Sequence, residues 1–225
     1  MSGRVGYNNV VTDGLVLYLD AGNKASYPGS GTTWRDLSAY KNNGTLTNGP
    51  TFSSANSGNI VFDGTDDYVN VSHNSIFNVS EFSICFWFIS KKDVDNYIVT
   101  KGNNSWYVGI GPSGQTSSKL SFFVEGTSGG WLQTNANITQ NIWYFGTVTF
   151  KSNLSSIYLN NSLDNSGTRT GNPLNGTSDV TVGVRFDGTG GNLNGNLSNF
   201  LIYNRGLSAS EVLQNYNAQK GRYGL

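Results

Sequence analysis

The sequence has few charged residues and no cluster of one sign. Lys, Arg, Asp and Glu make up 12% of the chain, against about 25% in a typical globular protein. The 14 basic residues balance the 14 acidic ones. A basic patch is the electrostatic footprint of a protein that binds phosphate backbones, so we expect no nucleic-acid partner.

Cysteine and histidine are almost absent. With one of each, Cys85 has no disulfide partner and a structural zinc site is excluded. Cys85 lies in the apolar segment FSICFWF, where a thiol packs as a small apolar group. His73 is predicted to be a surface residue, because no G-x-S-x-G motif supplies a nucleophile for it to activate.

Long hydrophobic runs are also absent. The N-terminal stretch MSGRVGYNNVV lacks the apolar core of a signal peptide, and runs such as LVLYL and FWFI are too short to cross a bilayer. We therefore expect a protein made in the cytoplasm, with no membrane partner.

Short alternating apolar segments fill the space between turns. Leu15–Asp20 alternates with the period of two that is typical of a strand. Phe82–Ile89 is apolar on both faces toward its end, which predicts a central strand. Residues 60–62 and 68–71 predict two strands joined by a hairpin or a corner. Further strands are expected at 97–100, 106–110, 120–125, 143–150, 156–159, 180–184 and 197–203. Regular short strands separated by Gly, Asn and Ser favour an antiparallel sandwich.

One helix is predicted near the C-terminus. Ser208 and Glu211 have the spacing of a capping box, and Leu207 and Val212 that of a hydrophobic staple. Gly221 is the expected stop. So short a helix is marginal alone, so it should pack on the sandwich.

These segments together resemble the laminin G-like jelly-roll family of the concanavalin A-like lectin and glucanase superfamily. The resemblance is carried by GLVLYLDAGN, WRDLSAYKNNGTL, IVFDGTDDYVNV, FSICFWF, VTFKSNLSSIYLNNSL and GNLSNFLIYNRGLSASEVLQNYNAQKG. It implies an all-β fold: an antiparallel two-sheet jelly-roll sandwich with one short C-terminal helix. We expect an N-terminal arm over residues 1–11 and one domain over 12–225.

Aromatic and amide side chains suggest a carbohydrate site. Trp34, Trp106 and Trp131 lie beside Gly- and Asn-rich loops and are expected to be exposed, with Asn103 as a hydrogen-bonding neighbour. Aromatic faces pack on pyranose rings, while amides bond the hydroxyl groups. Packing of these tryptophans against the protein is the favoured interpretation, and sugar contact is the alternative.

Asp63, Asp66 and Asp67 form the densest group of carboxylates. Calcium takes oxygen ligands of this kind, and the resemblance implies a calcium site at the rim of the sandwich. Asp36 with Asn42 and Asn43 offers a second loop of similar chemistry. Asp and Asn in turns more often bond their own backbone, so that is the favoured interpretation of these side chains and calcium binding is the alternative.

Catalysis is not expected. The three glutamates, Glu81, Glu125 and Glu211, do not form the E-x-D-x-E pattern of the related glucanases. Asp66 and Asp67 are adjacent, so their side chains diverge on a strand. Glycoside hydrolysis, which needs two carboxylates about 5 Å apart for retention, is kept as a remote alternative.

The opening and closing segments also resemble proteins of tailed bacteriophages. This second resemblance implies a non-enzymatic virion surface protein, either a capsid decoration subunit or a tail-associated module. Such a protein would contact other capsid or tail subunits and could form a homo-oligomer. The alternative is a carbohydrate-binding module or adhesin that recognises host surface glycans, with or without calcium.

Overall fold

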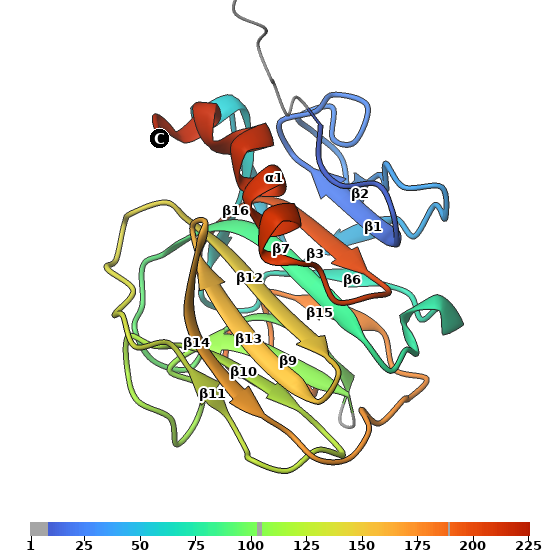
Figure 1. The fold of residues 1–225 in the computed structure, drawn as a ribbon. Coiled ribbons are helices and arrows are strands. Elements are labelled where there is room, and N and C mark those ends of the chain that lie inside the picture. The colour runs from blue at the N-terminus through green and yellow to red at the C-terminus, as the bar shows by residue number, and fades with distance from the viewer. Residues whose placement is uncertain (1–8, 103–104, 189) are drawn as a thin grey trace, which may run out of the picture.

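Two antiparallel sheets pack face to face, as the alternating segments predict (Figure 1). The computed structural model describes residues 9–102, 105–188 and 190–225. The strands are β1 (Leu15–Asp20), β2 (Thr33–Trp34), β3 (Gly44–Thr47), β4 (Thr51–Ser53), β5 (Asn59–Asp63), β6 (Tyr68–Val71), β7 (Phe82–Ser90), β8 (Asn96–Lys101), β9 (Trp106–Ile110), β10 (Leu120–Val124), β11 (Leu132–Gln133), β12 (Tyr144–Lys151), β13 (Leu154–Leu159), β14 (Ser162–Thr168), β15 (Val180–Val182) and β16 (Asn194–Tyr203). The helices are α1 (Ala209–Gln219) and the 3-10 helices η1 (Ala55–Ser57), η2 (Ser75–Phe77) and η4 (Lys220–Tyr223).

The strand order defines the two layers. Sheet A runs β14-β13-β12-β7-β16-β5-β4, and β1 pairs with β16. Sheet B runs β11-β10-β9-β8-β15-β6-β3-β2. The central position predicted for the FSICFWF strand is confirmed, because β7 pairs with β12 on one side and β16 on the other.

Alternation along each strand builds the core between the sheets. Phe82, Ile84, Phe86 and Phe88 of β7 point inward and meet the inward residues of sheet B, such as Val108 and Phe122. The large apolar area that these side chains remove from water is the main stabilising contribution to such a sandwich.

The other face of sheet A is covered by the C-terminal segment (Figure 1). Trp87 of β7 points outward and stacks on Tyr223, with ring centroids 3.9 Å apart, and on Tyr216 of α1 at 5.6 Å. Cys85 lies in the same cluster, and burial raises the pKa of its thiol to about 12. A neutral, inert thiol matches the sequence prediction.

The predicted capping box at the start of α1 is confirmed. The Ser208 side chain accepts from the Glu211 backbone, and Glu211 accepts from the Ser208 backbone N–H at 2.8 Å. The two residues predicted to form the staple, Leu207 and Val212, are both buried in the outer cluster. The α-helix ends at Gln219 with Lys220 as its C-cap, so it stops just before Gly221 as predicted. The chain then continues as η4, and the left-handed conformation is found at Gly224 and not at Gly221.

Of the hairpin and the corner considered between residues 60–62 and 68–71, the corner is observed, because β5 belongs to sheet A and β6 to sheet B. Other strands were missed. β14 was not predicted, and neither were the short strands β2, β3, β4 and β11.

The described end of the N-terminal arm packs on the body. Val11 is buried; its backbone N–H donates to Asn215 Oδ1 at 2.8 Å, and its carbonyl accepts from Tyr203 Oη at 3.0 Å. Residues 1–8 of the expected arm lie outside the described residues. Within the described part of the chain, no helix is long and apolar enough to span a membrane.

Candidate glycan-binding face

Two of the three candidate tryptophans are buried, which confirms the favoured packing interpretation for them and makes the exposure considered for them wrong. Trp34 has 0% exposure in the core, because β2 pairs with β3 and draws the surrounding loop onto the sheet. Trp106 is 3% exposed and packs 5.8 Å from Phe82. The candidate Asn103 lies outside the described residues.

Trp131 belongs to a row of aromatic side chains on the outer face of sheet B. Its ring lies 5.2 Å from Phe123, which lies 5.9 Å from Tyr107, which in turn lies 5.5 Å from Phe186. These four residues, Phe186, Tyr107, Phe123 and Trp131, are called the aromatic row. Their neighbours Trp106, Val108, Phe122 and Val124 point into the core, so the alternation of β9 and β10 directs the row outward.

Three of the four rings of the row are partly accessible to solvent. Trp131, Phe123 and Phe186 are half-buried, and Tyr107 between them is buried. Burial raises the pKa of Tyr107, with the nearby Glu125 charge adding to the effect. The Tyr107 hydroxyl is therefore a neutral group at physiological pH.

A pocket of about 420 Å³ continues the row across β15 and β6. Phe186 belongs to both the row and the pocket, so the two form one surface. The pocket alone is called the rim pocket. It is lined by Asn48, Thr65, Asp66, Tyr68, Asn70, Thr181, Val184, Arg185, Phe186, Asp187, Gly188 and Asn192.

Hydroxyl, amide and charged groups surround the rim pocket. Asn70 donates to Asp179 at 2.8 Å, and Thr181 shares a 2.8 Å hydrogen bond with Thr100. Arg185 forms a two-pronged contact with Asp187 at 3.0 and 2.8 Å. A half-open hollow that combines aromatic rings with fixed donors and acceptors suits a ligand with many hydroxyl groups.

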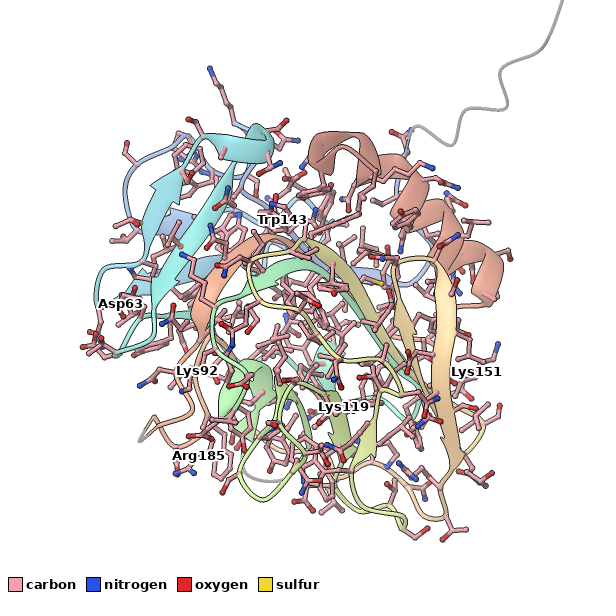
Figure 2. The ribbon with its side chains drawn as sticks, turned by 90° about the vertical axis from the view of Figure 1, so that its left-hand side faces the viewer. Asp63, Lys92, Lys119, Trp143, Lys151 and Arg185 are labelled. Atoms are coloured by element: carbon pink, nitrogen blue, oxygen red, sulfur yellow. The ribbon has the colours of Figure 1, made fainter. Side chains whose placement is uncertain are left out.

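The predicted aspartate cluster lies at the margin of this pocket. Figure 2 shows Asp63 and Arg185 on the same side of the molecule, and Asp66 lines the pocket itself. Oxygens of Asp63, Asp66 and Asp67 lie within 4.8 Å of one another. Asp67 is buried, and burial raises its pKa; the charges of Asp63 and Asp66 act in the same direction, although a backbone hydrogen bond from Asp63 opposes them.

The three carboxylates are the type of ligand that calcium takes, but they are fewer than its usual number of oxygen ligands. Asp63 Oδ1 already accepts from the Thr65 backbone at 2.7 Å, and Asp67 Oδ2 accepts from the Asp63 backbone at 3.0 Å. Calcium takes about six to eight oxygens, so carbonyls, waters or ligand hydroxyls must complete the shell. The residues that would hold the ion are Asp63, Asp66 and Asp67.

The second loop proposed for calcium is instead a folded turn. Asp36 Oδ1 accepts from the backbones of Tyr18 and Ser38, and its Oδ2 accepts from the Ser38 hydroxyl and the Asn42 backbone. Both oxygens are thus occupied by the chain. This loop therefore bonds its own backbone, as Asp and Asn commonly do in turns.

The glutamates lie on separate elements. Glu81 precedes β7 and accepts from Ser152 through both the backbone and the hydroxyl. Glu211 caps α1 and forms an ion pair with Arg205. Glu125 follows β10, which belongs to the other sheet. His73 is half-buried and its backbone N–H donates to Asp179. This placement gives no support to hydrolysis by a pair of glutamates.

Comparison with known proteins defines the class. The sequence profile of the concanavalin A-like lectin/glucanases superfamily matches residues 63–213, about two thirds of the chain. The chain therefore belongs to this superfamily, as its segments predict. Among curated proteins, no sequence relative was found.

Solved structures of low sequence identity share the fold. The binding domain of Paraclostridial Mosquitocidal Protein 1 is 20% identical, with a TM-score of 0.68 over 91% of this chain and 52% of that one. A botulinum neurotoxin type C structure is 20% identical, with a TM-score of 0.70 over 93% and 52%. The botulinum neurotoxin serotype D binding domain is 16% identical, with a TM-score of 0.70 over 94% and 53%. This chain spans about half the length of these structures, and at such identities the likeness shows the fold alone.

Proposed function

We propose that this protein is a non-catalytic binding module that recognises glycans through the outer face of sheet B. The observation that carries the proposal is the continuity of the aromatic row with the rim pocket. Sugar rings stack on the aromatic side chains, while Asn70, Thr181 and the backbone around them bond the hydroxyls.

The known relatives are compatible with this role. The superfamily includes lectins, and the mosquitocidal and serotype D neighbours are described as binding domains. The type C neurotoxin structure is described with two interacting ganglioside molecules. These descriptions support recognition of a glycan without specifying which glycan this chain binds.

A glycan array tests the proposal. The purified protein is applied once with calcium and once with a chelator, at matched ionic strength. We expect selective signals for a small set of related structures. A blank array under both conditions would contradict the glycan role, and signals that disappear with chelator would assign calcium a part in binding.

As the second candidate function, we propose that this protein is a surface protein of a bacteriophage virion. It would be made in the host cytoplasm and then attach to the particle. The observation that bears on it is the anchoring of Asn9 and Val11 to α1, through Gln214 and Asn215, which holds the described end of the N-terminal arm on the body. Deleting residues 1–8 should weaken attachment to the particle and leave the melting temperature unchanged. A fall in melting temperature that accompanies the weaker attachment would argue against a partner-binding arm.

A further inference from the structure

Arg169 is a buried arginine at the end of the sandwich, immediately after β14. Its side chain and backbone are together 5% exposed. One hydrogen bond is formed by its guanidinium, from Nη1 to the Thr168 carbonyl at 3.3 Å. The remaining N–H donors have no partner among the described residues, and they reach solvent, since none of them is a fully buried atom.

No acidic residue neutralises this cation. All fourteen aspartates and glutamates of the sequence lie within residues 9–102, 105–188 and 190–225. The ion pairs in that part of the chain involve Arg185, Arg205 and Arg222, and none involves Arg169. Burial lowers the pKa of Arg169, and no neighbouring charge opposes the effect.

Lys101, also deeply buried, differs. Its Nζ donates to the Gly176 carbonyl at 2.9 Å. Burial lowers the pKa of Lys101 as well, but the Asp179 charge acts in the opposite direction. The buried charge of Lys101 is therefore compensated by groups of this chain, whereas the charge of Arg169 is not.

The chain is shaped to hold the Arg169 guanidinium. Gly129 has a φ of +90°, and a Cβ there would collide with the guanidinium; a Cβ at Gly167 would lie 3.2 Å from Nη1. The two flanking loops are tied together, since Ser128 N–H donates to the Thr170 carbonyl at 2.8 Å and Thr170 N–H donates to Ser128 Oγ at 3.0 Å. The guanidinium thus lies against a defined structure, with its unbonded N–H groups open to solvent.

Partial burial of an unpaired charge opposes folding, because the lost hydration of a guanidinium is offset only by a counter-charge or by hydrogen bonds. A planar guanidinium with adjacent free N–H groups matches the paired oxygens of a carboxylate or a sulfate. The missing partner therefore has the chemistry of an oxyanion.

The position of Arg169 connects it with the aromatic row. Gly129, which lies against the guanidinium, is two residues before Trp131 at the end of the row. We propose that Arg169 binds the carboxylate or sulfate group of an acidic glycan whose sugar rings lie on the aromatic row. This inference rests on the proposed glycan-binding function and adds the class of ligand.

Matched glycan pairs test it. Each pair consists of a neutral oligosaccharide and the same chain with one uronate or one sulfate group, and affinity is measured by titration calorimetry. Wild type should bind the acidic member about 10-fold more tightly, the size expected for a charge-assisted pair of hydrogen bonds. Arg169→Met should remove this preference and leave the affinity for the neutral member within about 2-fold. The uronate and sulfate arms show which oxyanion is preferred.

Arg35→Met is the matched control. Arg35 is exposed, so its replacement makes the same change in net charge away from the site and should keep the preference. Melting temperature supplies a second readout: replacing an unpaired buried charge with an apolar side chain should leave it unchanged or raise it. A fall in melting temperature with an intact acidic preference would make Arg169 a structural residue and overturn the inference.

A second experiment separates this inference from the proposed function. The melting temperatures of wild type and Arg169→Met are compared in sodium sulfate, sodium acetate and sodium chloride at equal ionic strength. An oxyanion-specific rise in wild type that the variant lacks would support the anion site even if no glycan bound. Identical responses of the two proteins would overturn it, whatever the glycan array shows.

Discussion

Arg222 and Asp20 form a two-pronged ion pair, with Nη1 to Oδ1 at 2.7 Å and Nη2 to Oδ2 at 2.9 Å, although 202 positions separate them in the chain. Asp20 ends β1 and is 1% exposed. Burial works against the charge on Arg222, but the hydrogen bonds and charge of Asp20 outweigh it, so the pKa of Arg222 is raised. The pair fixes the C-terminal segment to the first strand.

Replacing Arg222 with Met should lower the free energy of unfolding by about 3 to 5 kcal/mol, because it leaves the Asp20 carboxylate buried without its partner. Urea denaturation measures the loss. The double variant Asp20→Asn with Arg222→Met should be less destabilised than the two single losses added together. Simple additivity would contradict coupling between the two residues.

The capping glutamate should make stability depend on pH. Hydrogen bonds from Arg205, followed by those from Ser208, hold the pKa of Glu211 at about 2, below its usual 4.5, against the opposing effect of partial burial. A lowered folded-state pKa contributes stability above about pH 4.5, and this contribution is lost as the pH falls toward 2.

Glu211→Gln should therefore cost about 2 kcal/mol at neutral pH and almost nothing near pH 2. Chemical denaturation of both proteins across this range measures the difference. Arg205→Met should remove the larger part of this pH-dependent contribution, and the hydrogen bonds from Ser208 should retain the rest. A constant difference between wild type and Glu211→Gln at every pH would contradict the assignment.

Periodicity and capping chemistry were sufficient to predict the framework. β1 and β9 were predicted with their observed bounds, and the Ser208 capping box was predicted from residue spacing alone. β14 could not be found in this way, because its sequence SLDNSGT has no apolar alternation. Its strand conformation comes from pairing with β13, a tertiary effect that local sequence does not record.

The aromatic row was only partly predictable. Trp131 was a candidate, but Tyr107, Phe123 and Phe186 come from distant segments whose neighbourhood depends on strand order. A signal was present in the sequence: Tyr107 and Phe123 are large aromatics on the side of their strands opposite the core residues. Arg169 gave no comparable signal, because its lack of an acidic neighbour is a property of three-dimensional contacts.

Calcium binding remains a prediction from the aspartate cluster. Adding calcium should raise the melting temperature above its value in chelator, since an ion that binds the folded state alone stabilises it. Asp66→Asn should abolish the rise, whereas Asp93→Asn, outside the cluster, should preserve it. Differential scanning calorimetry measures both, and no calcium-dependent rise in wild type would end the idea.

The most direct test of the account is the affinity of aromatic-row variants for the glycan that gives the strongest array signal. Trp131→Ala and Phe186→Ala should each weaken binding by about 10-fold or more, as the loss of an aromatic anchor does. Tyr40→Ala removes an exposed aromatic ring that is not part of the row or of the rim pocket and should leave the affinity unchanged. Unaltered binding by both row variants, with their folds intact, would contradict the claim that the outer face of sheet B is the glycan-binding surface.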